Sequence, residues 1–228
     1  MKKSELDWLL KRYIDVFKDR NPDKEESSIY IVGSQSFWGK HNSGSEIMKF
    51  SRELDVIPDV YSEEIDCDYE FVLGENSIHH MDFNTALDIV EEKTIKVPTN
   101  WKDRCINKPI IYDGFKLSVK YLDPHDLLFA KIIANREKDL RFIEEMFRCN
   151  ILSVKKLNNI FNNEMNEHLK SEKDYLRIRD KLNYFINKHL NPSKKIKIYK
   201  TFEIDDFEDL DNKLKSYQKK KSSLKPKS

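Results

Sequence analysis

The sequence predicts an α/β fold followed by a C-terminal helical bundle. Two short hydrophobic runs, residues 28–34 and 52–58, are typical of strands, and apolar residues at helical spacing flank them on both sides. Beyond Asn150, helical spacing dominates, with few β-branched residues and no glycine in the predicted helices. We therefore expect an α/β domain over residues 1–150 and a helical bundle with a charged tail over residues 151–228.

The first predicted element is an amphipathic helix over residues 4–17, with Ser4 as its N-cap. Its apolar residues recur three and four positions apart and are Leu6, Leu9, Leu10, Tyr13, Ile14 and Phe17. Asn21-Pro22-Asp23 then breaks the chain before the first strand. After that strand we expect a polar, glycine-containing insert over residues 38–44 and a short helix over residues 46–50.

The other strands are predicted from further short apolar runs, at residues 52–58, 65–73, 85–90 and 115–122. Asp123 is expected to cap the next helix, with Pro124 in its first position. That helix continues, kinked near Asn135, to residue 147. Two more helices are predicted over residues 154–169 and 175–190.

Composition limits the class of protein but not its partners. The chain has 228 residues and is 36% charged, yet 41 Lys and Arg nearly balance 40 Asp and Glu. The three cysteines have no zinc-site spacing, so we expect free thiols in a reducing compartment. We see neither a signal-peptide h-region nor an apolar run of bilayer length, so we expect a cytoplasmic protein with no membrane partner.

The C-terminal tail divides by charge. Residues 201–211 carry six acids, and residues 212–228 carry seven lysines and no acid. A solvated helix with a frayed end explains this pattern most simply. The alternative is a lysine arm that reaches phosphate backbones.

Glu53 and Asp55 are the first candidate site residues. They lie two positions apart in a predicted strand, so their side chains share one face, while Leu54 and Val56 point into a core. Two adjacent carboxylates repel each other, and a divalent cation such as Mg²⁺ removes that repulsion. The bland alternative is a solvated strand face.

Gly33 and Ser34 follow the first strand. Gly33 would let the backbone turn tightly and approach a phosphate without a Cβ in the way. Ser34 would offer its hydroxyl and N–H, at the electropositive start of a helix. A third carboxylate would serve as base or metal ligand, and Asp88 is the candidate because it interrupts a short apolar run. Asp68 and Asp82 are its rivals.

Lys131, Asn135 and Asp139 are spaced four residues apart and would share one face of a continuous helix. Lys131 could contact triphosphate oxygens, with Asp139 orienting it or the acceptor. Arg136 and Lys138 add positive charge nearby. An exposed helix face is the alternative.

Other residues have simpler explanations. Trp101 is expected to pack rather than to stack on a substrate. His79 and His80 have no partner at metal-ligand spacing.

Several motifs occur in one order along residues 29–147. They are Gly33-Ser34, Glu53-Leu54-Asp55, Trp101 to Arg104 after Val97-Pro98, Asp123-Pro124-His125-Asp126-Leu127, and Lys131 to Asp139. This series resembles the nucleotidyltransferase-like proteins of the AbiEii toxin group. The C-terminal helical part adds only architecture to the resemblance.

The resemblance implies a polymerase-β-like nucleotidyltransferase fold with a mixed sheet, Mg²⁺, and transfer of a nucleotide from an NTP. Some members modify tRNA and several are toxins, so the implied partners are an NTP, an RNA or protein acceptor, and an antitoxin. The Gly-Ser motif falls on Gly33 and Ser34. The metal carboxylates fall on Glu53 and Asp55, and the Lys/Asp motif falls on Lys131 and Asp139.

The chain departs from the family pattern in two ways: Glu53 stands where Asp is usual, and the segment from Ser34 to Glu53 is longer. These departures support a second hypothesis, a catalytically impaired protein that binds nucleotide or nucleic acid. A third is a pure interaction protein that uses its helical bundle to bind an antitoxin or another copy of itself.

Overall fold

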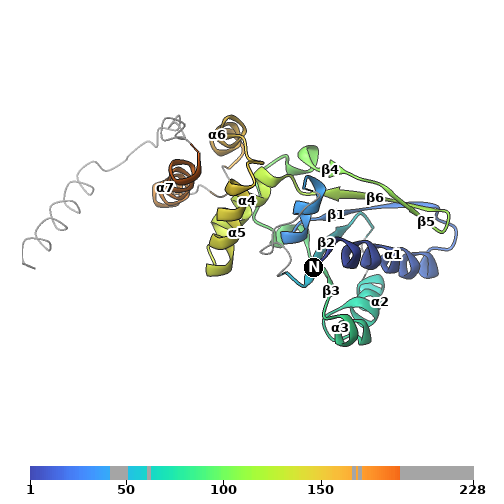
Figure 1. Ribbon diagram of the computed structural model, residues 1–228. Helices are drawn as coiled ribbons and strands as arrows, with labels where there is room; N and C mark the ends of the chain where they lie inside the picture. Colours follow the sequence, from blue (N-terminus) through green and yellow to red (C-terminus); the bar gives the residue numbers. More distant parts are fainter. Residues whose placement is uncertain (42–50, 61–62, 166–167, 169–170, 191–228) are drawn as a thin grey trace, which may run out of the picture. The chain divides into compact units, whose positions relative to one another are not determined.

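The computed structural model describes residues 1–41, 51–60, 63–165, 168 and 171–190 (Figure 1). The chain divides into one compact unit, Met1–Lys197, and a second unit, Ile198–Ser228, and every described residue belongs to the first. The predicted helix over residues 46–50 and the charged tail lie outside the described residues. The boundary predicted at residue 150 stays a prediction.

The described strands form one six-stranded mixed sheet, which confirms the predicted α/β class. They are β1 (Glu26–Ile31), β2 (Glu53–Pro58), β3 (Ala86–Ile89), β4 (Ile106–Asn107), β5 (Ile110–Tyr112) and β6 (Phe115–Tyr121). The order is β3–β2–β1–β6–β4, with β5 also paired to β6. β1 lies parallel to β6 and antiparallel to β2, and β2 lies parallel to β3.

The α-helices of the described residues are α1 (Lys3–Arg20), α2 (Glu63–Leu73), α3 (Ile78–Phe83), α4 (Pro124–Ala134), α5 (Glu137–Arg148), α6 (Val154–Asn163) and α7 (Glu172–His189). Short 3-10 helices cover Ser34–Gly39 (η1), Glu92–Thr94 (η3) and Trp101–Arg104 (η4). Among the described residues, no helix is both long and apolar enough to cross a bilayer.

The prediction of a strand over residues 65–73 was wrong, because this segment is the helix α2. Tyr69 and Leu73 are both fully buried, four residues apart. A strand would bury Phe71 as well, two residues from each of them, but Phe71 is 84% exposed, as expected for the opposite side of a helix. A short apolar run is compatible with either element, and here tertiary packing decided for the helix.

The first helix begins earlier than predicted. α1 starts at Lys3, and its N-cap is Lys2 rather than Ser4. The Glu5 carboxylate accepts a hydrogen bond from the Lys2 backbone N–H at 2.5 Å, so the N3 residue reaches back to the N-cap and Ser4 lies inside the helix. The predicted apolar stripe of this helix is confirmed as buried.

The predicted helix over residues 124–147 is two helices. Asp123 caps α4 through the His125 N–H, with Pro124 at the start, as predicted. The kink expected near Asn135 is a complete break, because Asn135 adopts the left-handed conformation with φ of 55° and ends α4. Later in the chain, α6 ends at Asn163 rather than at residue 169.

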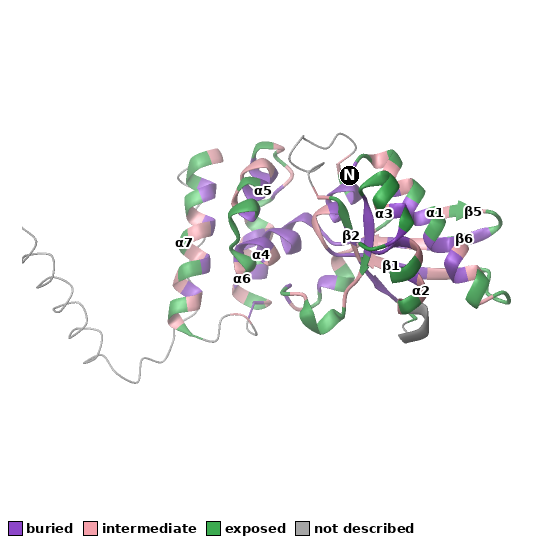
Figure 2. Cartoon of the chain, turned by 90° about the horizontal axis from the view of Figure 1, so that it is seen from below, coloured by how far each residue is buried: buried purple, intermediate pink, exposed green. Residues whose placement is uncertain are grey.

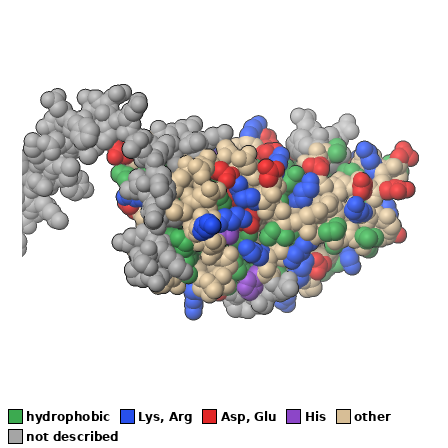
Figure 3. Space-filling model, turned by 90° about the horizontal axis from the view of Figure 1, so that it is seen from above, with side chains coloured by type: hydrophobic (Ala, Val, Ile, Leu, Met, Phe, Trp, Pro, Cys, Tyr) green, Lys and Arg blue, Asp and Glu red, His purple; other side chains and the backbone are tan. Residues whose placement is uncertain are grey.

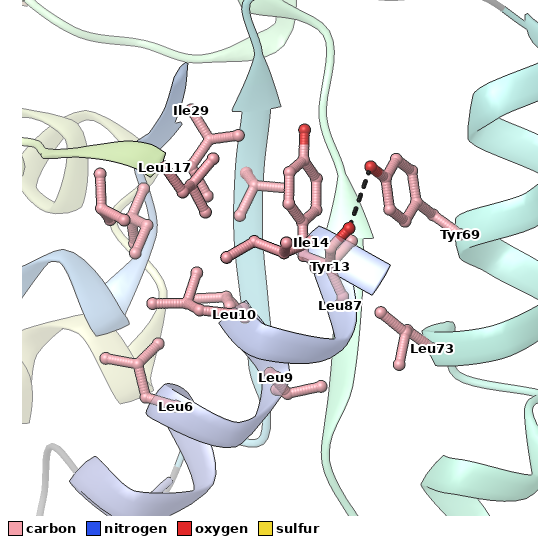
Figure 4. Packing of buried hydrophobic residues seen from close by; sticks show 14 of the residues in the cluster. Leu6, Leu9, Leu10, Tyr13, Ile14, Ile29, Tyr69, Leu73, Leu87 and Leu117 are labelled. Carbon is pink, nitrogen blue, oxygen red and sulfur yellow. Dashed lines mark hydrogen bonds between the residues drawn. The ribbon is translucent and has the colours of Figure 1, made fainter. Parts of the chain in front are cut away.

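α1 and α2 pack against one face of the sheet. The core there joins Leu10 and Ile14 of α1 to strand residues such as Ile29, Leu87 and Leu117 (Figure 4). The Tyr13 and Tyr69 rings stack with centroids 4.5 Å apart, and the Tyr69 hydroxyl donates to the Tyr13 carbonyl oxygen at 3.4 Å. Figure 2 shows buried strand residues in purple beneath exposed helix surfaces in green. Because hydrophobic side chains fill this face of the sheet, polar site residues lie on the opposite face.

Candidate active site

Two carboxylates meet on the sheet face opposite the core. Asp55 of β2 lies directly opposite Asp88 of β3 in the parallel register. Leu54 and Val56, on either side of Asp55, are fully buried in the core, so the Asp55 side chain projects to the other face. The structure therefore pairs Asp55 with Asp88, and Glu53 stands two residues earlier on the same face.

The folded environment disfavours the negative charge of both carboxylates. Burial, reinforced by the charge of Asp88, raises the pKa of Asp55 to about 6, although Lys131 acts to lower it. Burial and the charge of Glu53 also raise the pKa of Asp88. Both shifts mean that the negative charges are poorly compensated by the protein alone.

Gly33 lies directly against the Asp55 carboxylate. A Cβ built on Gly33 would fall 1.4 Å from Asp55 Oδ2, so any larger residue would displace that oxygen. The φ of Gly33 is −84°, a value open to other residues. Glycine is therefore required at this position for space, which the Asp55 carboxylate occupies, and the approach of Gly33 to a phosphate stays a prediction.

Ser34 contacts Lys131, the lysine of the candidate site. Its hydroxyl oxygen accepts a hydrogen bond from Lys131 Nζ at 2.8 Å. The helix expected after Ser34 is the 3-10 helix η1, which has six residues and is too short to supply a helix dipole at its start. The serine therefore acts through its side chain in this arrangement, by holding a lysine.

Lys131 is buried and lies between Ser34 and Asp139. Its Nζ is 3.2 Å from Asp139 Oδ1. Burial lowers the pKa of Lys131, and the charge of Asp139 opposes that shift. For Asp139, burial acts to raise the pKa, but the hydrogen bond from Arg136 and the charge of Lys131 outweigh it and lower the pKa. Each side chain therefore favours the charged form of the other, and their contact holds both in place.

The expectation that Lys131, Asn135 and Asp139 share one face of a continuous helix was wrong, because the chain breaks at Asn135. The contact between Lys131 and Asp139 forms across the break instead. Asp139 is the third residue of α5, where its carboxylate accepts a hydrogen bond from the Arg136 N–H at 3.3 Å. The side chain of Asn135 accepts a hydrogen bond from Lys181 of α7 rather than facing the site.

A cavity of about 480 Å³ opens beside this cluster. Its described lining comprises Ser34, Ser51, Lys131, Glu137, Lys138, Asp139, Arg141 and Phe142. Lysine and arginine side chains therefore face the cavity from α4 and α5. Arg136, at the start of α5, has its pKa raised by its hydrogen bond to Asp139 and, more weakly, by the charges of Asp55 and Glu53.

The three predicted metal carboxylates do not converge on one point. Among the described residues, no group of three or more His, Cys, Asp or Glu is placed to hold a metal ion. Glu53 is exposed and pairs in register with Ala86, not with an acid. The structure thus presents two opposed carboxylates, with Glu53 beside them.

The rival acids lie elsewhere. Asp68 forms an ion pair with Arg20 of α1 at 2.5 Å. Asp82 is exposed on α3. His79 lies within hydrogen-bond distance of Thr85 Oγ1, at 3.0 Å, and Trp101 is buried edge-on against Tyr30, as the packing interpretation predicts.

The motif around Asp123 links α4 to α6, a structural role that the sequence did not reveal. His125 Nδ1 lies 2.7 Å from Asp123 Oδ1, and His125 Nε2 accepts from the Ser153 N–H at 2.8 Å. The Nδ1 position therefore carries the donated proton, and the imidazole links α4 to the start of α6. Lys156 adds an ion pair to Asp123 at 3.0 Å.

Arg104 and Asp126 are the second pair that sequence reasoning missed. Arg104 Nε and Nη2 donate to the two oxygens of the fully buried Asp126 at 2.9 and 2.7 Å. Arg104 also donates to the Thr99 carbonyl and to Glu164. Arg104, Asp126 at the start of α4 and Glu164 at the end of α6 lie far apart in the sequence. Only the fold brings them together.

A mixed sheet with a carboxylate pair, a glycine-serine turn and a facing lysine defines a nucleotidyltransferase-like domain. The chain belongs to the family described as "Nucleotidyltransferase of unknown function (DUF6036)", whose model matches residues 10–190. No curated protein and no solved structure matches it significantly. Membership of the AbiEii toxin group in particular stays a prediction.

Proposed function

We propose that this protein is a Mg²⁺-dependent enzyme that transfers a nucleotide from an NTP to a hydroxyl group on RNA or protein, with release of pyrophosphate. The observation that carries the proposal is the opposition of Asp55 and Asp88, closed on one side by Gly33 and faced by Lys131. The family of the chain supports the general reaction. The metal, the substrate and the acceptor are our inference.

Two opposed carboxylates fit Mg²⁺, which proteins commonly bind through one or two carboxylates together with substrate phosphates. The raised pKa of Asp55 supports this assignment, because burial and the charge of Asp88 disfavour its negative charge, which a bound cation would favour. Asp55 and Asp88 would hold the ion. When bound, Mg²⁺ supplies charge neutralisation and alignment at the phosphates.

The other residues bind and orient. Lys131 would donate to triphosphate oxygens from the wall of the cavity, and Asp139 holds its Nζ in position. Ser34 fixes the same ammonium from the sheet side. Asp88 or Glu53 would accept the proton of the attacking hydroxyl, since both are nearer to solvent than Asp55.

RNA, such as tRNA, is one acceptor class, and the alternative interpretation of residues 212–228 as a lysine arm that reaches phosphate backbones would support it. A protein hydroxyl is the other acceptor class. Transfer to either would suit a toxin held in check by an antitoxin, as the resemblance implies. This role in the cell rests on that resemblance alone.

The test incubates the purified protein with each labelled NTP, Mg²⁺ and total cellular RNA or protein. We expect a labelled product with at least one NTP, sensitive to ribonuclease or to protease according to the acceptor. Asp55→Asn should abolish labelling. Asp82→Asn, which alters an exposed acid on α3, should not. No product with any NTP and either acceptor would reject the proposal.

A second candidate function is nucleotide or nucleic-acid binding without catalysis. It is favoured by the exposed Glu53 in place of the usual Asp and by the lack of a three-ligand metal group among the described residues. Calorimetry separates the two candidates. Tight NTP binding without turnover, preserved in Asp55→Asn, would support this second function.

A further inference from the structure

The chain has a long stretch without a positive side chain. Residues 53–92 contain thirteen Asp or Glu and no Lys or Arg. By contrast, the face shown in Figure 3 carries both signs of charge, blue among red. The acid-only stretch includes α2 and α3, which lie on the near side in Figure 2. This asymmetry is invisible in the net charge of the whole chain.

The same two helices expose large apolar side chains. Phe71 is 84% exposed, Ile78 77% and Met81 75%. Ile78 and Met81 are one turn apart on α3, so they share a face. Monomeric proteins seldom gather several such side chains in one place, and a gathered patch with a polar rim marks an interaction surface.

A groove runs between the helices. It has a volume of about 730 Å³ and is lined by Asp66, Cys67, Glu70, Phe71, Val72, Asn76, Ser77 and Ile78. Among the described residues, the lining therefore combines apolar side chains with two acids and includes no basic residue. We name it the α2–α3 groove.

We propose that the α2–α3 groove binds an amphipathic helix of another protein, with Lys or Arg beside the apolar face of that helix. Apolar side chains of the partner would cover Phe71 and Ile78, in the helix-in-groove mode. Its cations would face Asp66 and Glu70, and the exposed Glu75 and Asp82 belong to the same acid-only stretch of the chain. Complementary charge of this kind sets partner choice and the rate of encounter.

Charge also argues against a second copy of this chain as the occupant. A two-fold interface places the same patch on both subunits, so this groove would meet itself. Acids would then face acids, and such juxtaposition costs binding energy. A basic partner turns that repulsion into attraction.

The test measures binding of two synthetic amphipathic helices of about 18 residues, long enough to fold in the groove. Both have the same leucine face, and one has lysine flanks where the other has glutamate. We expect the lysine peptide to bind the full-length protein at least about tenfold more tightly. We expect this preference to shrink as salt is raised from about 0.05 to 0.5 M.

Variants locate the site. The double variant Phe71→Ser/Ile78→Ser should weaken binding of the lysine peptide at least about tenfold. Ile111→Ser is the matched control, since Ile111 of β5 is 78% exposed and lies outside the groove. Circular dichroism melts of each variant establish that the fold is kept. Labelled-nucleotide transfer should be unchanged, because neither residue belongs to the candidate active site.

Several outcomes would overturn the inference. Equal binding of the two peptides would remove the role of charge, and equal loss in Ile111→Ser would place binding elsewhere. No detectable binding of the lysine peptide up to millimolar concentration would reject the groove as its site. Sedimentation that shows a dimer, dissociated by Phe71→Ser/Ile78→Ser, would assign the groove to a second copy instead.

Discussion

Lys131 Nζ lies 2.8 Å from Ser34 Oγ, which joins two residues 97 positions apart in the chain. The bond ties the turn after β1 to α4, and so ties the carboxylate strands to the helices that face them. Lys131 is consequently held from the sheet by Ser34 and from α5 by Asp139. A cation restrained on both sides loses little conformational entropy when it meets a ligand.

Lys131→Met should weaken NTP binding about tenfold to a hundredfold, because a charge-assisted hydrogen bond contributes about 1.5–3 kcal/mol. The matched control is Lys138→Met, which removes an exposed lysine from the same cavity wall. That control should change binding no more than about threefold. Calorimetric titration with a non-hydrolysable NTP measures both. Equal effects would mean that Lys131 acts only as one charge among several.

Asp55 should make the stability of the fold depend on pH and, through the proposed metal site, on Mg²⁺. Its pKa is raised from its ordinary value to about 6, so the folded protein holds a proton there more strongly than the unfolded chain. The resulting stabilisation is present below about pH 4 and is lost as the pH rises through about 6. Mg²⁺ competes with that proton, so its effect should be small at pH 5 and large at pH 7.5.

At a Mg²⁺ concentration ten times the dissociation constant, we expect the melting temperature at pH 7.5 to rise by about 3–5 °C. Asp55→Asn should abolish this rise and flatten the pH dependence between pH 4 and 7. Asp82→Asn should preserve both. Thermal melts with and without Mg²⁺ provide the measurement. A rise that survives in Asp55→Asn would place the metal elsewhere.

Two glycine variants distinguish a steric requirement for glycine from a conformational one. Gly33→Ala should abolish nucleotide transfer, because the new Cβ would collide with Asp55 Oδ2. Gly114, in the turn between β5 and β6, has a φ of +74° and open space around the position of a Cβ. Gly114→Ala should therefore cost about 1–2 kcal/mol of stability and leave activity unchanged. Urea unfolding and the transfer assay together test this contrast.

Arg104→Ala should destabilise the fold by about 3 kcal/mol, because it leaves the buried Asp126 carboxylate without its partner. The control is Arg141→Ala, since the Arg141–Glu137 pair is exposed and should contribute less than about 0.5 kcal/mol. Urea unfolding at pH 7.5 measures both. A loss in Arg104→Ala no larger than in the control would show that Asp126 finds another partner or takes up a proton.

Local patterns in the sequence predicted several elements correctly. The alternation at Leu54 and Val56 identified β2 and its buried face, and Asp123-Pro124 identified the start of α4. Residues 65–73 defeated the same reasoning, because a short apolar run does not distinguish a strand from a helix. The start of α1 was also missed. The Glu5 carboxylate accepts from the Lys2 N–H, and the helix begins before Ser4.

The site was predictable where residues lie on one strand and not where the fold must join distant segments. Asp55 was found from its own strand, and Asp88 from its interruption of an apolar run. Their opposition depends on the register between β2 and β3, which local spacing does not encode. Contacts such as Arg104 with Asp126, and Ser153 with His125, depend on tertiary packing and left no local signal.

The placement of Asp88 on β3 has a mechanical consequence. β3 ends the sheet among the described strands and is four residues long, so a single neighbour, β2, holds it. Any ligand that binds both Asp55 and Asp88 would cross-link the two strands. Amide protons of residues 86–89 should then exchange with solvent more slowly when the ligand is bound, while those of β1 and β6 barely respond.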